Sequence, residues 1–96
     1  MLKCDRGAIY KSAIDRYGYR NQLIVAIEEL SELQKELCKS LRGEGCRANI
    51  VEEMADVSIM VEQLTMIYKC DSAVKLEIER KVCRLDERIK ALPKKK

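Results

Sequence analysis

Apolar residues recur every third or fourth position through most of the chain, and this spacing is typical of one face of an α-helix. The clearest stripe lies in residues 19–41, where Leu23, Ile27, Leu30 and Leu37 fall on one side. Little interrupts the periodicity, because the 96 residues include only one proline and four glycines. The pattern predicts an all-α protein, folded as a bundle of about four helices.

The ends of the periodic segments indicate where each helix begins and ends and which residues cap it. A glycine-containing loop at residues 42–48 separates the second helix from the third. We expect helices over residues 5–17, 19–41, 49–70 and 71–92. The residues expected at their ends are Asp5 and Gly18 for the first, Asn49 with Glu52 as a capping box for the third, and Asp71 or Ser72 with Pro93 for the fourth.

The third predicted helix is apolar on most of its sides, which favours a central position in the bundle. The fourth combines an apolar stripe with a basic face that includes Lys81, Arg84 and Arg88. We expect the apolar stripes of the helices to form the core. In the third helix the longest stripe runs through Ile50, Met54, Val57, Val61, Leu64 and Tyr68.

The chain is short enough to form one domain, and a domain of this size has a small core relative to its surface. We expect residues 1–92 to form a helical domain and residues 93–96 to form a basic tail. The small core also predicts assembly into a homodimer or homotetramer. The formal net charge of +3 is accounted for by the three lysines of the tail, so it does not indicate a nucleic-acid-binding surface.

Composition argues against several classes of protein. No stretch of about 18 uncharged apolar residues is present, and charges at Asp5 and Arg6 come too early for a secretory signal. The chain has no Trp or Phe to stack on nucleic-acid bases, and it has no His. Its five cysteines are widely spaced and include no C-x-x-C pair. We therefore expect reduced thiols, no zinc site and a cytoplasmic protein.

Two acidic clusters interrupt the apolar pattern on the second and third helices. Residues 28–32 read EELSE, and residues 52–56 read EEMAD. In each cluster carboxylates recur three or four residues apart, so they share one side of the helix. Because the intervening loop is short, the clusters should face each other at one level of the bundle. Carboxylates beside apolar stripes must be paired, protonated or bound to a cation.

Three interpretations of these carboxylates differ in their chemistry. A solvated acidic face paired with lysines suits Glu28 and Glu36, but suits the acids that border the apolar stripes less well. Di-iron bundles use Glu-x-x-His motifs, which a chain without His cannot supply. The third interpretation is a site for Mg²⁺ or Mn²⁺, hard ions that take oxygen ligands and commonly share them with substrate phosphates. This combination favours metal-assisted phosphate chemistry.

The spacing of the acids also resembles a family motif. Glu28-Glu29-x-x-Glu32, followed after about twenty residues by Glu53-x-x-Asp56, resembles the EExxE…ExxD signature of the MazG-like all-α nucleoside triphosphate pyrophosphohydrolases. That family is related to the dimeric dUTPases and dCTP pyrophosphatases, and the chain looks like its small stand-alone members. The resemblance implies an enzyme that hydrolyses a (deoxy)nucleoside triphosphate to the monophosphate and pyrophosphate with Mg²⁺, and so cleans the nucleotide pool.

The resemblance also implies roles for individual residues. Lys81, Arg84 and Arg88 would hold the phosphates, and their alternative role is a solvated helix face. A non-catalytic helical interaction module with a degenerate metal site is the alternative for the whole protein. The implied metal ligands are Glu29, Glu32, Glu53 and Asp56, and the implied general base is one of Glu28, Glu29 and Glu32.

A glutamine is the candidate for contact with the nucleoside. Gln22 lies two helical turns before Glu29 on the same stripe, and a side-chain amide can read a base edge. Its alternative role is that of an exposed residue at the helix start. Met60 and Gln63 follow Asp56 on the third helix and either line the same pocket or pack in the core.

Overall fold

The computed structural model describes residues 4–94, which contain four α-helices and no strand. The all-α class predicted from the periodicity is confirmed. Lys95 and Lys96 of the predicted basic tail lie outside the described residues. The helices are α1 (Arg6–Tyr17), α2 (Tyr19–Leu41), α3 (Arg47–Ile67) and α4 (Asp71–Ala91).

The ends of α1 and α2 lie where the sequence predicts them. The Asp5 carboxylate accepts a hydrogen bond of 3.1 Å from the backbone N–H of Ala8, which satisfies one free donor of the first turn. Gly18 has φ 87°, a left-handed conformation that favours glycine, and it separates α1 from α2. The chain can therefore change direction between two adjoining helices within one residue.

The start of α3 and the N-caps of both α3 and α4 differ from the prediction. Helix α3 begins at Arg47, so Asn49 lies inside its first turn and the predicted capping box with Glu52 is wrong. Helix α4 includes Asp71, and Cys70 takes the N-cap position. Asp71 instead forms an ion pair of 3.0 Å with Lys75, one turn further along. In both cases a cysteine without a side-chain cap precedes the helix, and no propensity rule would select it.

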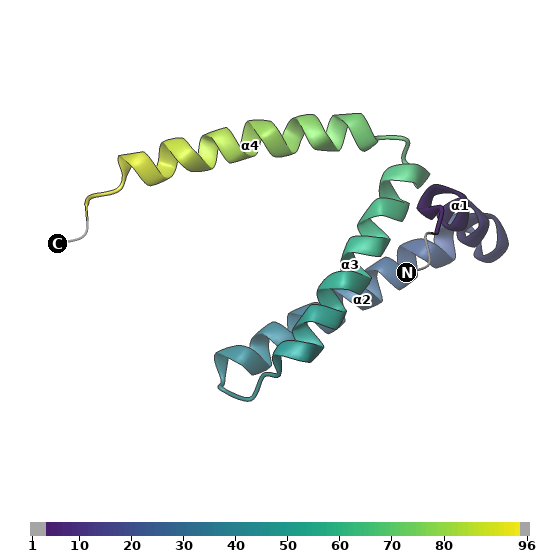
Figure 1. The fold of residues 1–96 in the computed structure, drawn as a ribbon, viewed down its shortest axis with the longest axis horizontal. Helices are drawn as coiled ribbons and strands as arrows, with labels where there is room; N and C mark the ends of the chain where they lie inside the picture. Colours follow the sequence, from purple (N-terminus) through teal and green to yellow (C-terminus); the bar gives the residue numbers. More distant parts are fainter. Residues whose placement is uncertain (1–3, 95–96) are drawn as a thin grey trace.

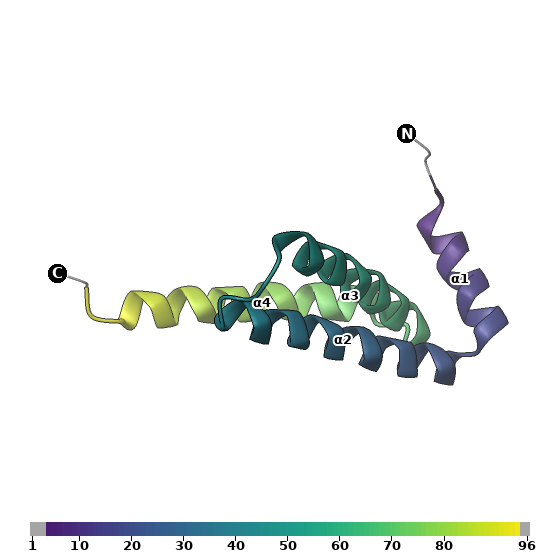
Figure 2. The same ribbon diagram turned by 90° about the horizontal axis from the view of Figure 1, so that it is seen from below.

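Helices α2 and α3 form an antiparallel hairpin, and α1 stands at the end of the hairpin that lies away from the connecting loop (Figures 1 and 2). The two helices of the hairpin form the most extensive contact between elements. Helix α4 leaves the end of α3 and extends away from the hairpin (Figure 1). Among the described helices it contacts only α3. None of its residues is buried.

The apolar stripe of α2 does not form the core that the periodicity predicts. Ile27 and Leu30 are 63% and 50% exposed, whereas Gln22, Ala26 and Glu36 are buried against α3. The contact uses the stripe beside the leucines, about a quarter turn around the helix. The leucines stay uncovered because α4, the element that could cover them, points away from the hairpin.

The tight loop between α2 and α3 depends on Gly45. A Cβ atom at this position would lie 2.7 Å from the Cα atom of Ser40, which is backbone and cannot move aside cheaply. We expect Gly45→Ala to lower the free energy of unfolding by about 1–2 kcal/mol. Gly7→Ala is the matched control, because its Cβ would meet nothing closer than 3.6 Å and would favour the helix. Urea unfolding of both variants checks this, and a Gly45→Ala protein as stable as Gly7→Ala would contradict it.

No helix within residues 4–94 is both long enough and apolar enough to cross a membrane.

Candidate metal centre

Three carboxylates from the two acidic clusters meet between α2 and α3. Glu29 comes from α2, and Glu53 and Asp56 come from α3. One oxygen atom of each lies within 4.8 Å of an oxygen of both others. The two clusters therefore face each other at one level, as the short loop predicts.

The sequence places each of these side chains by simple helix geometry. Glu53 and Asp56 are three residues apart, so they project from the same side of α3 in successive turns. Glu29 lies two turns after Gln22 and one turn after Ala26 on the stripe of α2 that faces α3. The polar stripe, and not the leucine stripe, forms the contact between the helices. Because the polar stripe of α2 faces α3, the acids of the two helices come together.

Two carboxyl groups of the cluster, those of Glu29 and Glu53, have a raised pKa. Burial is the main cause that raises the pKa of Glu29 above its ordinary value, followed by the charges of Asp56 and Glu53 and a hydrogen bond with Asp56. Burial also raises the pKa of Glu53, followed by the charges of Asp56, Glu32, Glu52 and Glu36. The dominant charges around both groups are negative, so the cluster repels itself when it is ionised.

No described lysine or arginine neutralises this repulsion. Glu29, Glu53 and Asp56 take part in none of the ion pairs within residues 4–94. Lys39 of α2 lies 3.4 Å from Glu36 and is engaged there. In addition, Oε2 of Glu53 is buried and has no hydrogen-bond partner. A buried carboxylate oxygen without a partner is rare in folded proteins, and a ligand or a bound proton would satisfy it.

The cluster suits a hard divalent cation. All three groups offer carboxylate oxygens, the ligand type that Mg²⁺ and Mn²⁺ prefer over nitrogen or sulfur. Their spacing allows one oxygen of each to approach a common centre. A dication there would remove the mutual repulsion and give the orphaned oxygen of Glu53 a partner.

The other predicted acids lie around this group and not within it. Glu32 is exposed and is not one of the three converging carboxylates, although its charge contributes to the raised pKa of both Glu29 and Glu53. Glu28 is exposed one position before Glu29, on the outer side of α2. Three of the four predicted metal ligands are thus brought together, and Glu32 stands close enough to influence them electrostatically.

Gln22 is buried, in contrast to the exposed helix-start residue that was one of its two predicted roles. Its Nε2 donates a hydrogen bond of 2.7 Å to Oε1 of Gln63 across the hairpin. Gln63 in turn lies with its Nε2 3.7 Å from the sulfur of Met60. All three side chains are buried. The amide pair therefore belongs to the contact between α2 and α3, two turns from the acidic cluster.

The hydrogen bond between the amides of Gln22 and Gln63 should contribute to the stability of the protein. Gln22→Ala leaves the amide of Gln63 buried without its partner, so we expect the free energy of unfolding to fall by about 1–3 kcal/mol. Removing both amides, as in Gln22→Leu with Gln63→Leu, should cost less than the single change because no orphaned group remains. Urea unfolding of the single and the double variant measures the two free energies of unfolding. A double variant that is the less stable of the two would contradict this account.

The predicted phosphate-binding residues are not near the cluster within one chain. Lys81, Arg84 and Arg88 are exposed on α4, which contacts only α3 among the described helices. Their basic face is therefore free in the isolated chain. Only a second copy could bring these residues to an acidic cluster without a rearrangement of α4.

A groove of about 450 Å³ lies between α1 and α3, and none of Glu29, Glu53 and Asp56 lines it. Ala55, the neighbour of Asp56, lies in its wall, together with Ile9, Ala13 and Ile59. At its rim the phenol of Tyr10 donates a hydrogen bond of 2.9 Å to Glu62, which also pairs with Arg6 at 3.1 Å. Sequence reasoning did not identify this groove, because no periodicity shows on which side of α3 the short helix α1 packs.

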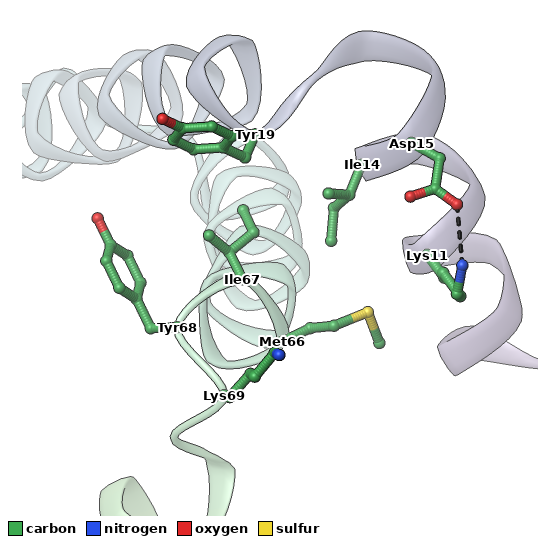
Figure 3. A pocket seen from close by; sticks show the side chains of 8 residues that line it. All are labelled: Lys11, Ile14, Asp15, Tyr19, Met66, Ile67, Tyr68 and Lys69. Carbon is green, nitrogen blue, oxygen red and sulfur yellow. Dashed lines mark hydrogen bonds and ion pairs between the residues drawn. The ribbon is translucent and has the colours of Figure 1, made fainter.

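A second cavity, of about 520 Å³, lies elsewhere (Figure 3). Tyr19, Tyr68 and Ile67 line it at the junction of α1, α2 and α3. Ile67 is eleven residues beyond Asp56 on α3, which corresponds to roughly 16 Å along the helix. Of its three charged residues, Lys11 and Asp15 pair with each other at 3.0 Å, and the third is Lys69. This cavity is too far from the acids to share a ligand atom with them.

The position, burial and unbalanced charge of the acidic cluster are thus the main grounds for assigning a function. The chain matches no protein-family model, no curated protein and no solved structure.

Proposed function

We propose that this protein is a Mg²⁺- or Mn²⁺-dependent nucleoside triphosphate pyrophosphohydrolase of the MazG-like type, which releases the monophosphate and pyrophosphate. The observation that carries the proposal is the convergence of Glu29, Glu53 and Asp56, none of which forms an ion pair with a lysine or arginine within residues 4–94. The EExxE…ExxD spacing supplies the choice of reaction, and the geometry supports its metal-binding half. The protein would act in removing unwanted nucleotides from the pool.

In this proposal the three converging acids hold the cation, and Glu32 completes the set from the exposed side of the cluster. A bound dication supplies charge neutralisation at a phosphate oxygen. Glu28, Glu29 and Glu32 remain the candidates for the general base. The base takes a proton from a water molecule, the water oxygen bonds to the α-phosphorus, and the bond to the bridging oxygen breaks to release pyrophosphate.

The groove between α1 and α3 is the proposed position of the nucleoside. Its volume of about 450 Å³ falls within the range of small-molecule sites. Ala55 and Ile59, which lie one and three residues from Asp56 along α3, offer apolar surface in it, and Gln63 also lines it. The buried bond between Gln63 and Gln22 would hold that amide in place, so Gln22 acts through Gln63. This role differs from direct contact of Gln22 with the base.

The phosphate tail is assigned to Lys81, Arg84 and Arg88. Because α4 extends away from its own hairpin, these residues would serve the site of another copy in a homodimer or homotetramer. Guanidinium and ammonium groups bind phosphate oxygens through charge-assisted hydrogen bonds. The site would then combine acids from one chain with cations from another.

Pyrophosphate release from a panel of deoxynucleoside and nucleoside triphosphates tests the proposal. We expect Mg²⁺-dependent release from at least one triphosphate, and a loss of activity in Glu32→Gln. Glu77→Gln is the matched control, because Glu77 is an exposed glutamate that pairs with Arg80 on α4. No release from any triphosphate, or equal activity in the two variants, would overturn the enzyme assignment. Cation binding without turnover would instead support a non-catalytic helical module, which the large exposed apolar surface of the chain also favours.

A further inference from the structure

The cavity at the junction of α1, α2 and α3 has the size of a small-molecule site. Its volume of about 520 Å³ lies within the usual range for such sites. Ile14 of α1 and Met66 and Ile67 of α3 give it an apolar lining. It is separate from the groove that is proposed for the nucleoside, because the two have no lining residue in common.

Two tyrosines supply aromatic surface on one side of this cavity. Tyr19 is the first residue of α2, and Tyr68 follows the last residue of α3. Figure 3 shows both rings on one side of Ile67, and the pair formed by Lys11 and Asp15 on the other. The two tyrosines are 55% and 63% exposed, so much of their aromatic surface is left uncovered by the chain. Such surface beside an apolar cavity suits a planar aromatic ligand, which gains from stacking and from burial of its own rings.

The lining of the cavity carries one uncompensated positive charge. Lys11 and Asp15 neutralise each other in their ion pair of 3.0 Å. Lys69, the third charged residue of the lining, takes part in no ion pair within residues 4–94. Its ammonium group can therefore bind an anionic group of a ligand without giving up a partner in the protein.

Lys69 occupies a backbone position that favours glycine. Its N–H donates to the carbonyl oxygen of Met66 at 3.2 Å, and the N–H of Cys70 donates to that of Thr65 at 2.9 Å. These two bonds form a Schellman motif, which ends α3 and requires a left-handed residue. Lys69 has φ 51° and is the one non-glycine residue within residues 4–94 with a positive φ. Because a Cβ atom is unfavourable in this conformation, the fold alone does not explain a lysine here, and a role for its ammonium in the cavity does.

We propose that this cavity binds a planar aromatic carboxylate. The rings of Tyr19 and Tyr68 contact the aromatic plane, Ile14 and Ile67 cover apolar parts of the ring system, and the ammonium of Lys69 pairs with the carboxylate. A single ammonium group balances the single charge of a carboxylate, whereas a phosphate monoester carries nearly twice that charge. A neutral aromatic molecule would leave the ammonium unpaired. The site needs neither the cation nor turnover, so it does not rest on the proposed function.

A titration with 2-naphthoate, followed by NMR through the methyl signals of isoleucine and methionine, tests this proposal. The signals of Ile14, Met66 and Ile67 should shift, and that of Ile78, which is exposed on α4, should not. 2-Naphthalenemethanol has the same rings without the charge and should bind about tenfold more weakly, because it lacks a bond to a charged group. Equal affinity for the two probes would overturn the proposal. Unshifted signals of Ile14 and Ile67 would also overturn it, and so would an equal shift of Ile78, which would show adsorption to apolar surface in general.

Substitution of Lys69 tests the role of its ammonium group. Lys69→Met should lower the affinity for 2-naphthoate about tenfold and leave the affinity for 2-naphthalenemethanol unchanged. Lys75→Met is the matched control, because Lys75 is an exposed lysine of α4 that pairs with Asp71 at 3.0 Å. Equal affinities of the two variants for 2-naphthoate would contradict the assignment.

Lys69→Gly separates ligand binding from stability. Glycine suits φ 51°, so this variant should melt at a higher temperature than the wild type and bind 2-naphthoate as weakly as Lys69→Met does. A lower melting temperature would show that the lysine serves the fold, and would remove its proposed role. In the free protein, NOE contacts from Ile14 or Ile67 to methyl groups of α4 or of a second chain would show that protein fills the cavity, and would overturn the proposal. None of these measurements uses activity, so an inactive protein that binds 2-naphthoate would remove the proposed function and leave this inference standing.

Discussion

Replacing Asp56 with asparagine is expected to reduce the rate of pyrophosphate release by about a hundredfold or more. Asp56 is one of the three converging carboxylates, and its charge contributes to the raised pKa of both Glu29 and Glu53. The amide keeps the shape of the side chain but removes a negative charge, so the affinity for the cation falls. The measurement is the steady-state rate at saturating Mg²⁺ and at a series of lower concentrations.

Two observations separate loss of the cation from loss of the fold. Asp56→Asn should remain as helical as the wild type, because the change relieves repulsion in the cluster. Asp86→Asn is the matched control, since Asp86 lies on α4 and pairs only with Lys90, at 2.9 Å. Its activity should equal that of the wild type. If Asp56→Asn and Asp86→Asn were equally active, the cluster would have no role in the reaction.

In the absence of divalent cations, the acidic cluster is expected to make the protein less stable as the pH rises. Glu29 and Glu53 have a pKa above the ordinary glutamate value of 4.5, so between that value and their folded pKa the folded chain binds more protons than the unfolded chain. The free energy of unfolding then falls with increasing pH, and the contribution is complete below the unfolded pKa and lost above the folded one. A bound dication should cancel this loss by neutralising the carboxylates.

Thermal unfolding between about pH 4 and pH 8 measures this effect, with a chelator and with Mg²⁺. The comparison with Glu29→Gln removes the contribution of the remaining titrating groups. With chelator, the melting temperature of the wild type should fall relative to that of Glu29→Gln as the pH rises. With Mg²⁺ the wild type should gain stability at high pH and the variant should gain less. Parallel curves for the two proteins under both conditions would show that the cluster carries no unbalanced charge.

The helices themselves were predictable because their information is local. Asp5 and Gly18 mark the ends of α1 by rules that need only neighbouring residues. The N-caps of α3 and α4 were predicted wrongly, because a favourable capping residue, Asn49 or Asp71, lies inside the helix while a cysteine takes the N-cap position. There, the rest of the helix and its contacts outweigh the preference of a single residue.

The core was less predictable than the helices, for a physical reason. Periodicity identifies the apolar stripe of α2 but does not say what covers it. In the single chain the stripe with Gln22, Ala26 and Glu29 meets α3, and Ile27 and Leu30 stay exposed. The sequence pattern therefore predicts the surfaces that require burial, and it leaves open whether burial occurs within one chain or between two.

The candidate site was only partly predictable from the sequence. Spacing alone placed the two acidic clusters opposite each other, because two helices joined by a short loop have little freedom to slide past each other. The family resemblance then narrowed the clusters to four ligands, of which Glu29, Glu53 and Asp56 converge. The groove between α1 and α3 was not found, since it depends on a contact that carries no periodic pattern. The partner of Gln22 was missed for the same reason: Gln63 lies 41 positions away along the chain.

Binding of Mn²⁺ tests the central claim, that the acidic cluster is a metal centre, more directly than any other measurement. Electron paramagnetic resonance gives the concentration of free Mn²⁺ during a titration of the wild type, Glu53→Gln and Glu77→Gln. We expect the wild type and Glu77→Gln to bind Mn²⁺ with equal affinity, competed by Mg²⁺, and Glu53→Gln to bind it at least tenfold more weakly. A wild type that binds no Mn²⁺, or a Glu53→Gln protein that binds it as well as the wild type does, would contradict the assignment.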